Sequence, residues 1–472
     1  MAQKELFDRQ VTKRGGGQVS RGDQDQTAEI EQTKRLKIFR EVAATEEAIR
    51  SSRYQNINDK PKIQRVPVMF RDHSNFRGYF EPTVIAIGPI HHGKLRYEWG
   101  EELKLQLAVN FVRDSEQNEV RLLKKVDEYI KELRECYDKE AIKNYDNDSL
   151  ALMLFVDGCS TLEFIYKYDD LESFQIKKDR VVFAERDMFL LENQLPYQLL
   201  KLLMSSSNIH EALKDSIERF VQMHGVAPGA TKQHPQHETI PMEPEPTHLL
   251  EYLLTTMLGY PPKRKSETRA SAQSICNVQE LQAAGIHFRQ RKGPSVLSDI
   301  YFKSYICCGF LYLPKIKVDD LMRLKFMNLI AYEMCPDFQN DFGVASYISF
   351  LNSLIDHQDD VKHLRKKHIL RNLLGSDEEV VRLFNEMDTI VVPNNQFSDK
   401  VKSMIEAHCN ATWKIWIAQF FHDHFSKPWV LGSIGILSGL GMIAVQTWYT
   451  VNSDNPSSPC KALLEYLKAR GY

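Results

Sequence analysis

The sequence lacks the charge imbalance, the metal-binding spacings and the early apolar segment that would each indicate a particular class of protein. Its 61 Lys and Arg residues nearly balance its 63 Asp and Glu residues, so the overall charge gives no reason to expect a nucleic-acid partner. The mean hydropathy of -0.40 excludes a protein that crosses a membrane many times. With 43% hydrophobic and 26% charged residues in 472, the composition predicts an ordinary globular protein of two or three structural units.

Cysteine is present, but not in the patterns that bind zinc or carry out redox chemistry. None of the 8 cysteines lies in a C-x-x-C sequence or at zinc-finger spacing from a histidine. Most lie in apolar runs, as Cys307 and Cys308 do, where cysteine behaves as a small hydrophobic residue. The nucleophile-elbow, H-E-x-x-H and G-x-G-x-x-G motifs are also missing. We therefore predict reduced core cysteines, no metal site, no cofactor and no catalytic residues.

Residues 1–60 contain no apolar stretch of the kind that a secretory signal requires, which is about 7–15 residues long. They are polar and include three consecutive glycines at 15–17, so they cannot bury enough surface to offset the cost of ordering. The sequence predicts a disordered N-terminal tail here, and a large domain that stays in the cytosol.

The segment Trp429–Val451 contains no charged residue and predicts one transmembrane helix. About 20 apolar residues in a helix cross a hydrocarbon layer of roughly 30 Å. Trp429 stands at one end and Trp448 with Tyr449 at the other, where aromatic residues favour the membrane interface. Membrane lipid is therefore a predicted partner, and residues 452–472 form a short tail on the far side of an unidentified membrane.

The same segment contains Gly435 and Gly439 in a G-x-x-x-G sequence, which permits close contact between helices. This pattern predicts self-association through the transmembrane helix. The alternative is a buried helix of a soluble core, which the glycines and Gln446 favour because they lower the hydropathy of the segment.

Between the two ends, the hydrophobic pattern predicts a mainly α-helical domain over residues 61–425, with a disordered insertion at 225–247. Asp187 is predicted to cap a helix that continues to Leu203 and is kinked at Pro196. Further helices are predicted in the ranges 101–140, 149–166, 248–258, 278–284, 321–334, 345–355, 361–370, 377–387 and 399–425. Extended or strand segments are predicted at 63–70, 83–88, 299–302, 310–313 and 390–392.

The strongest indication of an enzyme is the segment Gly88–Lys94, which satisfies the phosphate-loop pattern G-x-x-x-x-G-K after a predicted strand. Asp157 ends an apolar run, as a magnesium-binding aspartate does in nucleotide hydrolases. However, Leu95 replaces the hydroxyl residue that would bind magnesium, and Pro89 removes a backbone N–H. We interpret the loop, with its adjacent residues His91 and His92, as a hydrogen-bonded turn; a membrane-tethered nucleotide-binding enzyme is the alternative function.

Several blocks of sequence, in order, resemble the plant family labelled domain of unknown function 247 over about residues 63–451. The blocks are Arg65-Val66-Pro67, Tyr79-Phe80-Glu81-Pro82, Ala86-Ile87-Gly88-Pro89-Ile90-His91-His92-Gly93, Phe155-Val156-Asp157-Gly158-Cys159, Leu190-Leu191-Glu192-Asn193-Gln194-Leu195-Pro196-Tyr197, the segment 280–288, Asn328-Leu329-Ile330-Ala331-Tyr332-Glu333 and Phe425-Ser426-Lys427-Pro428-Trp429.

This resemblance implies a plant protein with a single C-terminal membrane anchor and no assigned catalytic residue. Some grass members of the family are implicated in self-incompatibility, in which pollen and stigma compare alleles. Ala86 and Ile90 stand where members commonly carry Ser and Tyr, which indicates a divergent member. The resemblance therefore implies a non-enzymatic, membrane-anchored recognition protein with a protein partner that the sequence does not identify.

Overall fold

The computed structural model describes residues 62–471 except 73–75, 175, 226–244, 260–276, 294, 306–307, 339–341, 390–395, 411–427 and 453–458. It is 64% helix and 7% strand, which confirms a mainly α fold with a few short strands. The predicted N-terminal tail, most of the predicted insertion at 225–247, the predicted strand at 390–392 and the end of the predicted helix 399–425 lie outside the described residues.

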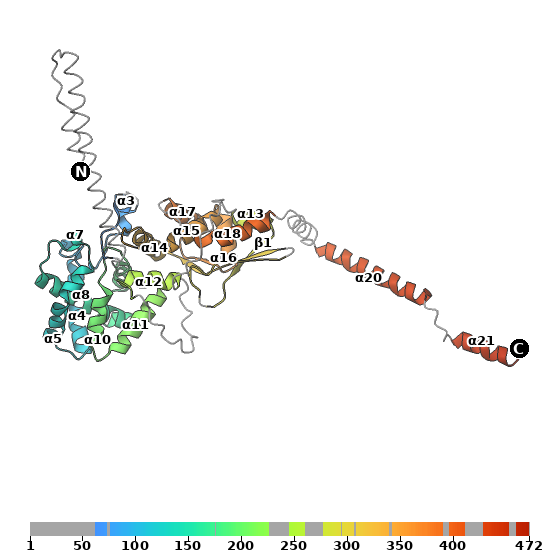
Figure 1. The fold of residues 1–472 in the computed structure, drawn as a ribbon, viewed down its shortest axis with the longest axis horizontal. Helices are drawn as coiled ribbons and strands as arrows, with labels where there is room; N and C mark the ends of the chain where they lie inside the picture. The colour runs from blue at the N-terminus through green and yellow to red at the C-terminus, as the bar shows by residue number, and fades with distance from the viewer. Residues whose placement is uncertain are drawn as a thin grey trace, which may run out of the picture. The chain divides into compact units, whose positions relative to one another are not determined.

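The helices of the domain follow one another in two stretches of sequence (Figure 1). The first comprises α3 (Val68–Arg71), α4 (Glu98–Asp114), α5 (Glu119–Glu128), α6 (Ile130–Glu135), α7 (Lys139–Ile142), α8 (Asn147–Tyr166), α9 (Lys178–Asp187), α10 (Tyr197–Ser205) and α11 (His210–Met223), with short 3₁₀ turns η1 (Arg77–Tyr79), η2 (Leu95–Tyr97) and η3 (Tyr168–Phe174). The second comprises α12 (Leu249–Leu258), α13 (Val278–Ala283), α14 (Asp320–Glu333), α15 (Gly343–Leu354), α16 (Gln358–Lys366), α17 (Asp377–Asp388) and α18 (Gln396–Cys409). Two more helices follow, α20 (Pro428–Asn452) and α21 (Pro459–Ala469).

Helix α8 is the centre of the first stretch, and α4, α5, α6, α10 and α11 pack against it. The Asp146 carboxylate accepts a hydrogen bond from the Ser149 amide and so caps the N-terminus of α8. Helix α10 approaches α8 closely, because a Cβ added to Gly158 would lie 2.6 Å from Leu203 Cδ1. Helix α8 is long and apolar enough to span a membrane. However, 78% of its most apolar 18 residues are buried inside the protein, as in the core helix of a folded domain.

Two small sheets lie within the second stretch. In the first, β3 (Gly309–Leu313) pairs with β1 (Ile286–Gln290) in parallel and with β2 (Tyr301–Ser304) in antiparallel orientation. In the second, β4 (Ile316–Val318) pairs in parallel with β5 (Leu370–Asn372). Every other residue of β3 is buried, so the sheet presents one face to the core.

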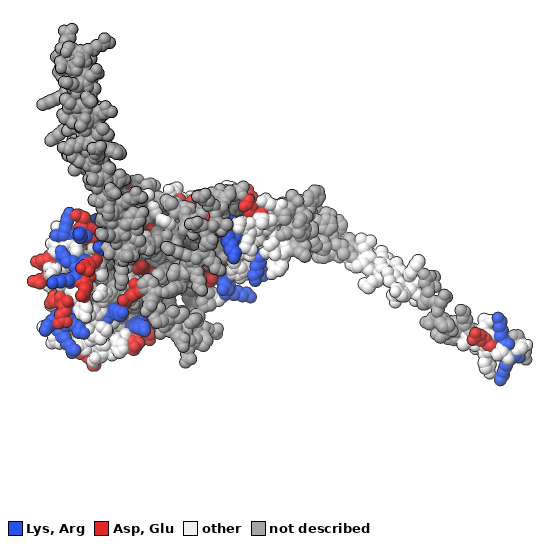
Figure 2. Space-filling model, in the orientation of Figure 1, with Lys and Arg blue, Asp and Glu red and all other residues white. Residues whose placement is uncertain are grey.

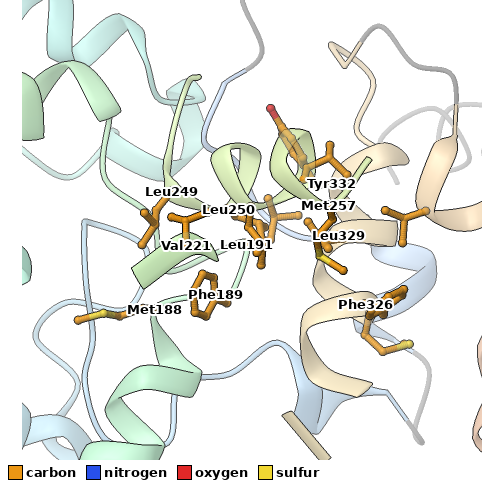
Figure 3. Packing of buried hydrophobic residues seen from close by; sticks show 14 of the residues in the cluster. Met188, Phe189, Leu191, Val221, Leu249, Leu250, Met257, Phe326, Leu329 and Tyr332 are labelled. Atoms are coloured by element: carbon orange, nitrogen blue, oxygen red, sulfur yellow. The ribbon is translucent and has the colours of Figure 1, made fainter. Parts of the chain in front are cut away.

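One hydrophobic cluster extends from Ile63 to Ile405 and joins the two stretches. At the seam between them, Phe189 and Val221 lie beside Leu250 of α12, and Phe326 of α14 belongs to the same cluster (Figure 3). The packing makes residues 63–405 one continuous core rather than two independent ones.

Several local predictions were wrong. Residues 83–88 form no strand, and Val68–Arg71 is a short helix instead of extended chain. Asp187 does not cap a helix, because it is the last residue of α9 and its carboxylate binds backbone amides of residues 83–85. Residues 190–196 form turns, and α10 begins only after Pro196. The strands β1, β4 and β5 were not predicted.

Candidate functional site

The segment 83–88, which the sequence predicted as a strand, is held in place by hydrogen bonds to two side chains. The Asp187 carboxylate accepts hydrogen bonds from the amides of Thr83 at 2.9 Å, Val84 at 2.6 Å and Ile85 at 3.0 Å. Asn193 accepts from the Ile87 amide at 2.7 Å and donates to the Ile85 carbonyl at 3.1 Å. These two side chains satisfy the backbone groups that a neighbouring strand would otherwise satisfy.

Burial raises the pKa of Asp187 to about 6, although its three amide donors act in the opposite direction. The Asp187 side chain is fully buried, and the partners of its carboxylate are the amides of Thr83, Val84 and Ile85. Asp187 is therefore a structural organiser of this segment.

Gly88 occupies the position at which the segment turns. Its amide donates to Asp157 Oδ2 at 2.7 Å, and its φ of +71° lies in the left-handed region that favours glycine. A Cβ at this position would lie 2.8 Å from the Gln194 carbonyl oxygen. The structure therefore requires glycine here because of the backbone conformation and the close contact.

Lys104 of α4 is a fully buried lysine whose ammonium group has three acceptors. Its Nζ donates to the Ala86 carbonyl at 2.7 Å and lies 2.6 Å from Asp157 Oδ1 and 2.9 Å from Glu101 Oε1. Burial alone would lower the pKa of Lys104, but the two carboxylates raise it above its ordinary value. This cation is matched to its surroundings and stabilises the turn that Gly88 begins.

The geometry does not arrange residues Gly88–Lys94 as a phosphate loop. In a phosphate loop the Gly88 amide would bind phosphate and the Asp157 carboxylate would bind magnesium. Here the Gly88 amide donates to Asp157, and Asp157 also forms an ion pair with Lys104. Lys94 Nζ lies 2.7 Å from His91 Nδ1, and the Leu95 side chain that follows is 89% exposed. The nucleotide-binding alternative therefore has no support from this loop, while the prediction that the chain is not an enzyme stays a prediction.

The two adjacent histidines contact different carboxylates. His91 Nε2 lies 3.0 Å from Glu192 Oε2, while His92 Nδ1 lies 3.9 Å from Glu101 Oε2. Burial alone would raise the pKa of Glu192, but His91 and the Val66 amide, which donates to its other oxygen at 2.9 Å, hold it below the ordinary value. In the part of the chain that the structure describes, no group of three His, Cys, Asp or Glu residues is placed to hold a metal.

The same network extends to helix α14. Asn328 accepts from the Leu191 amide at 2.8 Å and donates to the Tyr79 carbonyl, also at 2.8 Å. Together with the contacts above, these bonds connect the blocks that begin at Arg65, Tyr79, Ala86, Phe155, Leu190 and Asn328. Six of the eight blocks that carry the family resemblance thus form one largely buried hydrogen-bonded scaffold that maintains the fold.

Sequence reasoning missed the structural roles of Lys104 and Asp187. Lys104 lies between Leu103 and Leu107 on an apolar helix face, and this position is a weak signal of a buried cation. Asp187 gave no such signal, because the segment that it binds is about a hundred residues earlier in the sequence.

The residues predicted for the membrane span all lie in helix α20: Trp429, Gly435, Gly439, Trp448, Tyr449 and Val451. Large apolar side chains along this helix are exposed, including Ile436 at 67%, Ile443 at 60% and Trp448 at 69%. A Cβ added at Gly435 or Gly439 would meet no atom within 4 Å. Figure 2 shows no Lys, Arg, Asp or Glu colour on the described side chains of α20. The structure thus confirms a helix, and leaves its surroundings as a prediction.

Comparison with known proteins shows that the chain is similar to plant proteins. Residues 63–437 match the family model described as "Plant protein of unknown function", domain of unknown function 247. The chain is 25% identical to the UPF0481 protein At3g47200 of Arabidopsis thaliana, over 79% of this chain and 83% of that protein. It is also 26% identical to the putative UPF0481 protein At3g02645 of the same plant, over 38% of this chain and 34% of that protein. No solved structure matches.

Proposed function

Since the chain belongs to the plant family of domain of unknown function 247, for which no activity is described, we propose a function from its helix α20. The protein is a membrane-anchored interaction protein that catalyses no reaction. Its helical domain is presented at a membrane surface, and α20 holds it there.

The observation that carries this proposal is the composition and length of α20. The helix has 25 residues without an Asp, Glu, Lys or Arg. At 1.5 Å per residue it is about 37 Å long, which exceeds a hydrocarbon layer of roughly 30 Å. Its apolar side chains are exposed, in contrast to those of α8, so burial in lipid is the arrangement that removes them from water.

The proposal includes a topology and a biological role. The helical domain lies in the cytosol, and α21 lies across the membrane. The open face at Gly435 and Gly439 lets two copies of α20 approach each other. From the family resemblance, the proposed role is recognition between proteins, with pollen–stigma self-incompatibility as the specific case.

Carbonate extraction of plant microsomes that contain the full chain tests the anchor. We expect the wild-type chain in the membrane pellet, and a chain without residues 429–451 in the supernatant. Leu440→Arg places a charge at the middle of α20, where insertion of an arginine costs about 2.5–3.5 kcal/mol, and should move part of the protein to the supernatant. Leu463→Arg, the same change in α21, is the matched control and should leave the protein in the pellet. Full-length protein in the supernatant would refute the anchor.

Further measurements test the orientation, the alternative enzyme and the recognition role separately. Protease protection of a C-terminal tag in sealed microsomes, and glycosylation at Asn147 or Asn410, report the orientation; glycosylation at either residue contradicts a cytosolic domain. Nucleotide binding by the full chain that is lost in Lys94→Ala would favour the alternative enzyme. Proximity labelling in reproductive tissue should recover a protein partner only when α20 is intact, and a null plant with normal pollen rejection would contradict the recognition role.

A further inference from the structure

A cavity of about 160 Å³ lies at the seam between the two stretches of helices. Its apolar lining includes Met257, Met322 and Phe326, and two of these are among the buried side chains shown in Figure 3. Its polar lining includes Glu185 of α9, His224 after α11 and Lys325 of α14. Engineered cavities of about this volume hold a molecule of the size of benzene.

The polar groups of the wall are tied into a fixed arrangement. Glu185 receives the Tyr168 hydroxyl at 2.5 Å on one oxygen and lies 2.6 Å from His224 Nε2 with the other. His224 Nδ1 lies 2.6 Å from the Phe220 carbonyl oxygen. Burial alone would raise the pKa of Glu185, but His224 and Tyr168 hold it below the ordinary value, so Glu185 is an ionised carboxylate that is already satisfied.

Lys325 is a buried lysine in the lining of the cavity. It is 8% exposed, and its Nζ donates to the His224 carbonyl at 3.0 Å. Among the residues that the structure describes, no carboxylate oxygen lies within 4.0 Å of Lys325 Nζ, so Lys325 forms no ion pair with them. Asp319, which also lines the cavity, forms an ion pair with Lys317, whose Nζ lies 2.6 Å from Asp319 Oδ2. Burial and the charge of Lys317 lower the pKa of Lys325 to about 8, against the opposing effects of Asp319 and Glu185.

Lys104 shows what a purely structural buried lysine looks like in the same domain. Its ammonium group has two carboxylates and a carbonyl as acceptors, and their charge raises its pKa. Lys325 has one carbonyl acceptor and an adjoining cavity. At pH 7 an amine with a pKa of about 8 is roughly one tenth neutral, whereas an ordinary lysine is less than about one thousandth neutral.

The surroundings select the chemical class of the ligand. The carboxylates of Glu185 and Asp319 are offset by Lys325 and Lys317 in the same lining, so the wall has no excess charge that would favour an ion, and its apolar side chains favour a short alkyl group. An uncharged carbonyl compound has both the alkyl group and an electrophilic carbon for the amine. We propose that this cavity binds a small neutral aldehyde or ketone, of about six heavy atoms or fewer, as a reversible imine with Lys325.

The reaction needs no oxidant or reductant. The neutral amine of Lys325 forms an N–C bond to the carbonyl carbon, and a proton from nitrogen goes to the oxygen, giving a carbinolamine. The C–O bond then breaks, and the oxygen leaves as water with the second proton of the amine. One amine and one carbonyl give one imine and one water. This binding activity is independent of the membrane anchor proposed above.

Reductive trapping tests the proposal. The full chain in detergent micelles is treated at pH 7 with propanal and sodium cyanoborohydride, and propylation of each lysine is followed by peptide mass spectrometry. We expect Lys325 to be modified at least about tenfold faster than Lys143, whose side chain is 59% exposed. Lys104 is the matched buried control and should remain unmodified.

Two controls separate a built site from general reactivity. In urea, where the chain is unfolded, the preference for Lys325 over Lys143 should disappear. Met322→Phe fills the cavity without changing the amine and should slow propylation of Lys325 by about tenfold or more. If Lys325 reacts no faster than Lys143 in the native wild-type protein, the proposal is overturned. This result does not depend on whether Met322→Phe folds. Equal modification of Lys104 and Lys325 would overturn it too.

Discussion

Glu163, in the last turn of α8, is a buried carboxyl group without hydrogen-bond partners among the described residues. Its relative exposure is 0%, and neither Oε1 nor Oε2 has a donor in the described structure. Burial, and after it the negative charge of Asp114, raise the pKa of Glu163 to about 7, while Lys167 and Arg113 oppose the shift. The native state therefore favours the neutral acid.

The sign and size of the effect on stability follow from this shift. Between the ordinary pKa of 4.5 and the native pKa of about 7, the folded chain holds a proton that the unfolded chain releases. Stability from this group is thus fully present below pH 4.5, falls as the pH rises through this window, and stays lower above pH 7. A difference of about 2.5 pKa units corresponds to at most about 3.4 kcal/mol, and with the neighbouring cations we expect about 1–3 kcal/mol.

The assay is urea unfolding of wild type and Glu163→Gln at pH 5 and at pH 8. Gln is neutral at both values, so the variant should have about the wild-type stability at pH 5 and should be about 1–3 kcal/mol more stable than wild type at pH 8. Glu135→Gln, the same change at an exposed position, should show no such change between the two values. If the difference between Glu163→Gln and wild type is the same at both pH values, the reasoning about this carboxyl is wrong.

Three further predictions concern the buried network, each checked by urea unfolding of the variant. Lys104→Met leaves the Asp157 carboxylate buried without its cation and should cost about 3–5 kcal/mol; a loss under about 1 kcal/mol would contradict the role of the pair. In Gly88→Ala the new Cβ would meet the Gln194 carbonyl oxygen at a residue whose φ is positive, so the variant should lose at least about 2 kcal/mol of stability. Gly93→Ala should lose less, because φ is also positive there but no atom lies near the new Cβ. Asp187→Ala leaves the buried amide of Ile85 and the partly buried amides of Thr83 and Val84 without their acceptor and should cost about 2–5 kcal/mol; a loss under about 1 kcal/mol would show that water replaces the carboxylate.

Much of the fold is predictable from local sequence. The predicted helices at 149–166 and 377–387 correspond to α8 and α17, and those at 248–258 and 321–334 correspond to α12 and α14 within one residue. These helices carry apolar residues at helical spacing, and a cap or a charged first turn marks where they begin, so neighbouring residues contain the information.

The candidate site was harder to predict because its partners are distant in sequence. Residues 83–88 have the β-branched pattern of a strand, yet Asp187 and Asn193 supply their hydrogen-bond partners instead of another strand. Likewise, the Gly88–Lys94 loop satisfies a nucleotide-binding pattern, but Asp157 accepts a hydrogen bond from the Gly88 amide and pairs with Lys104. Only the folded chain shows which donor meets which acceptor.

The sequence by itself determined the helical character of the chain and the charge-free segment in α20, because hydropathy and periodicity are properties of neighbouring residues. Tertiary structure alone decided the chemistry of the buried charged groups. Lys104 and Lys325 are both lysines on apolar helices, but folding places two carboxylates beside the first and a cavity beside the second. The physical reason is that desolvation and Coulomb interactions depend on distances that the chain acquires only when remote segments pack together.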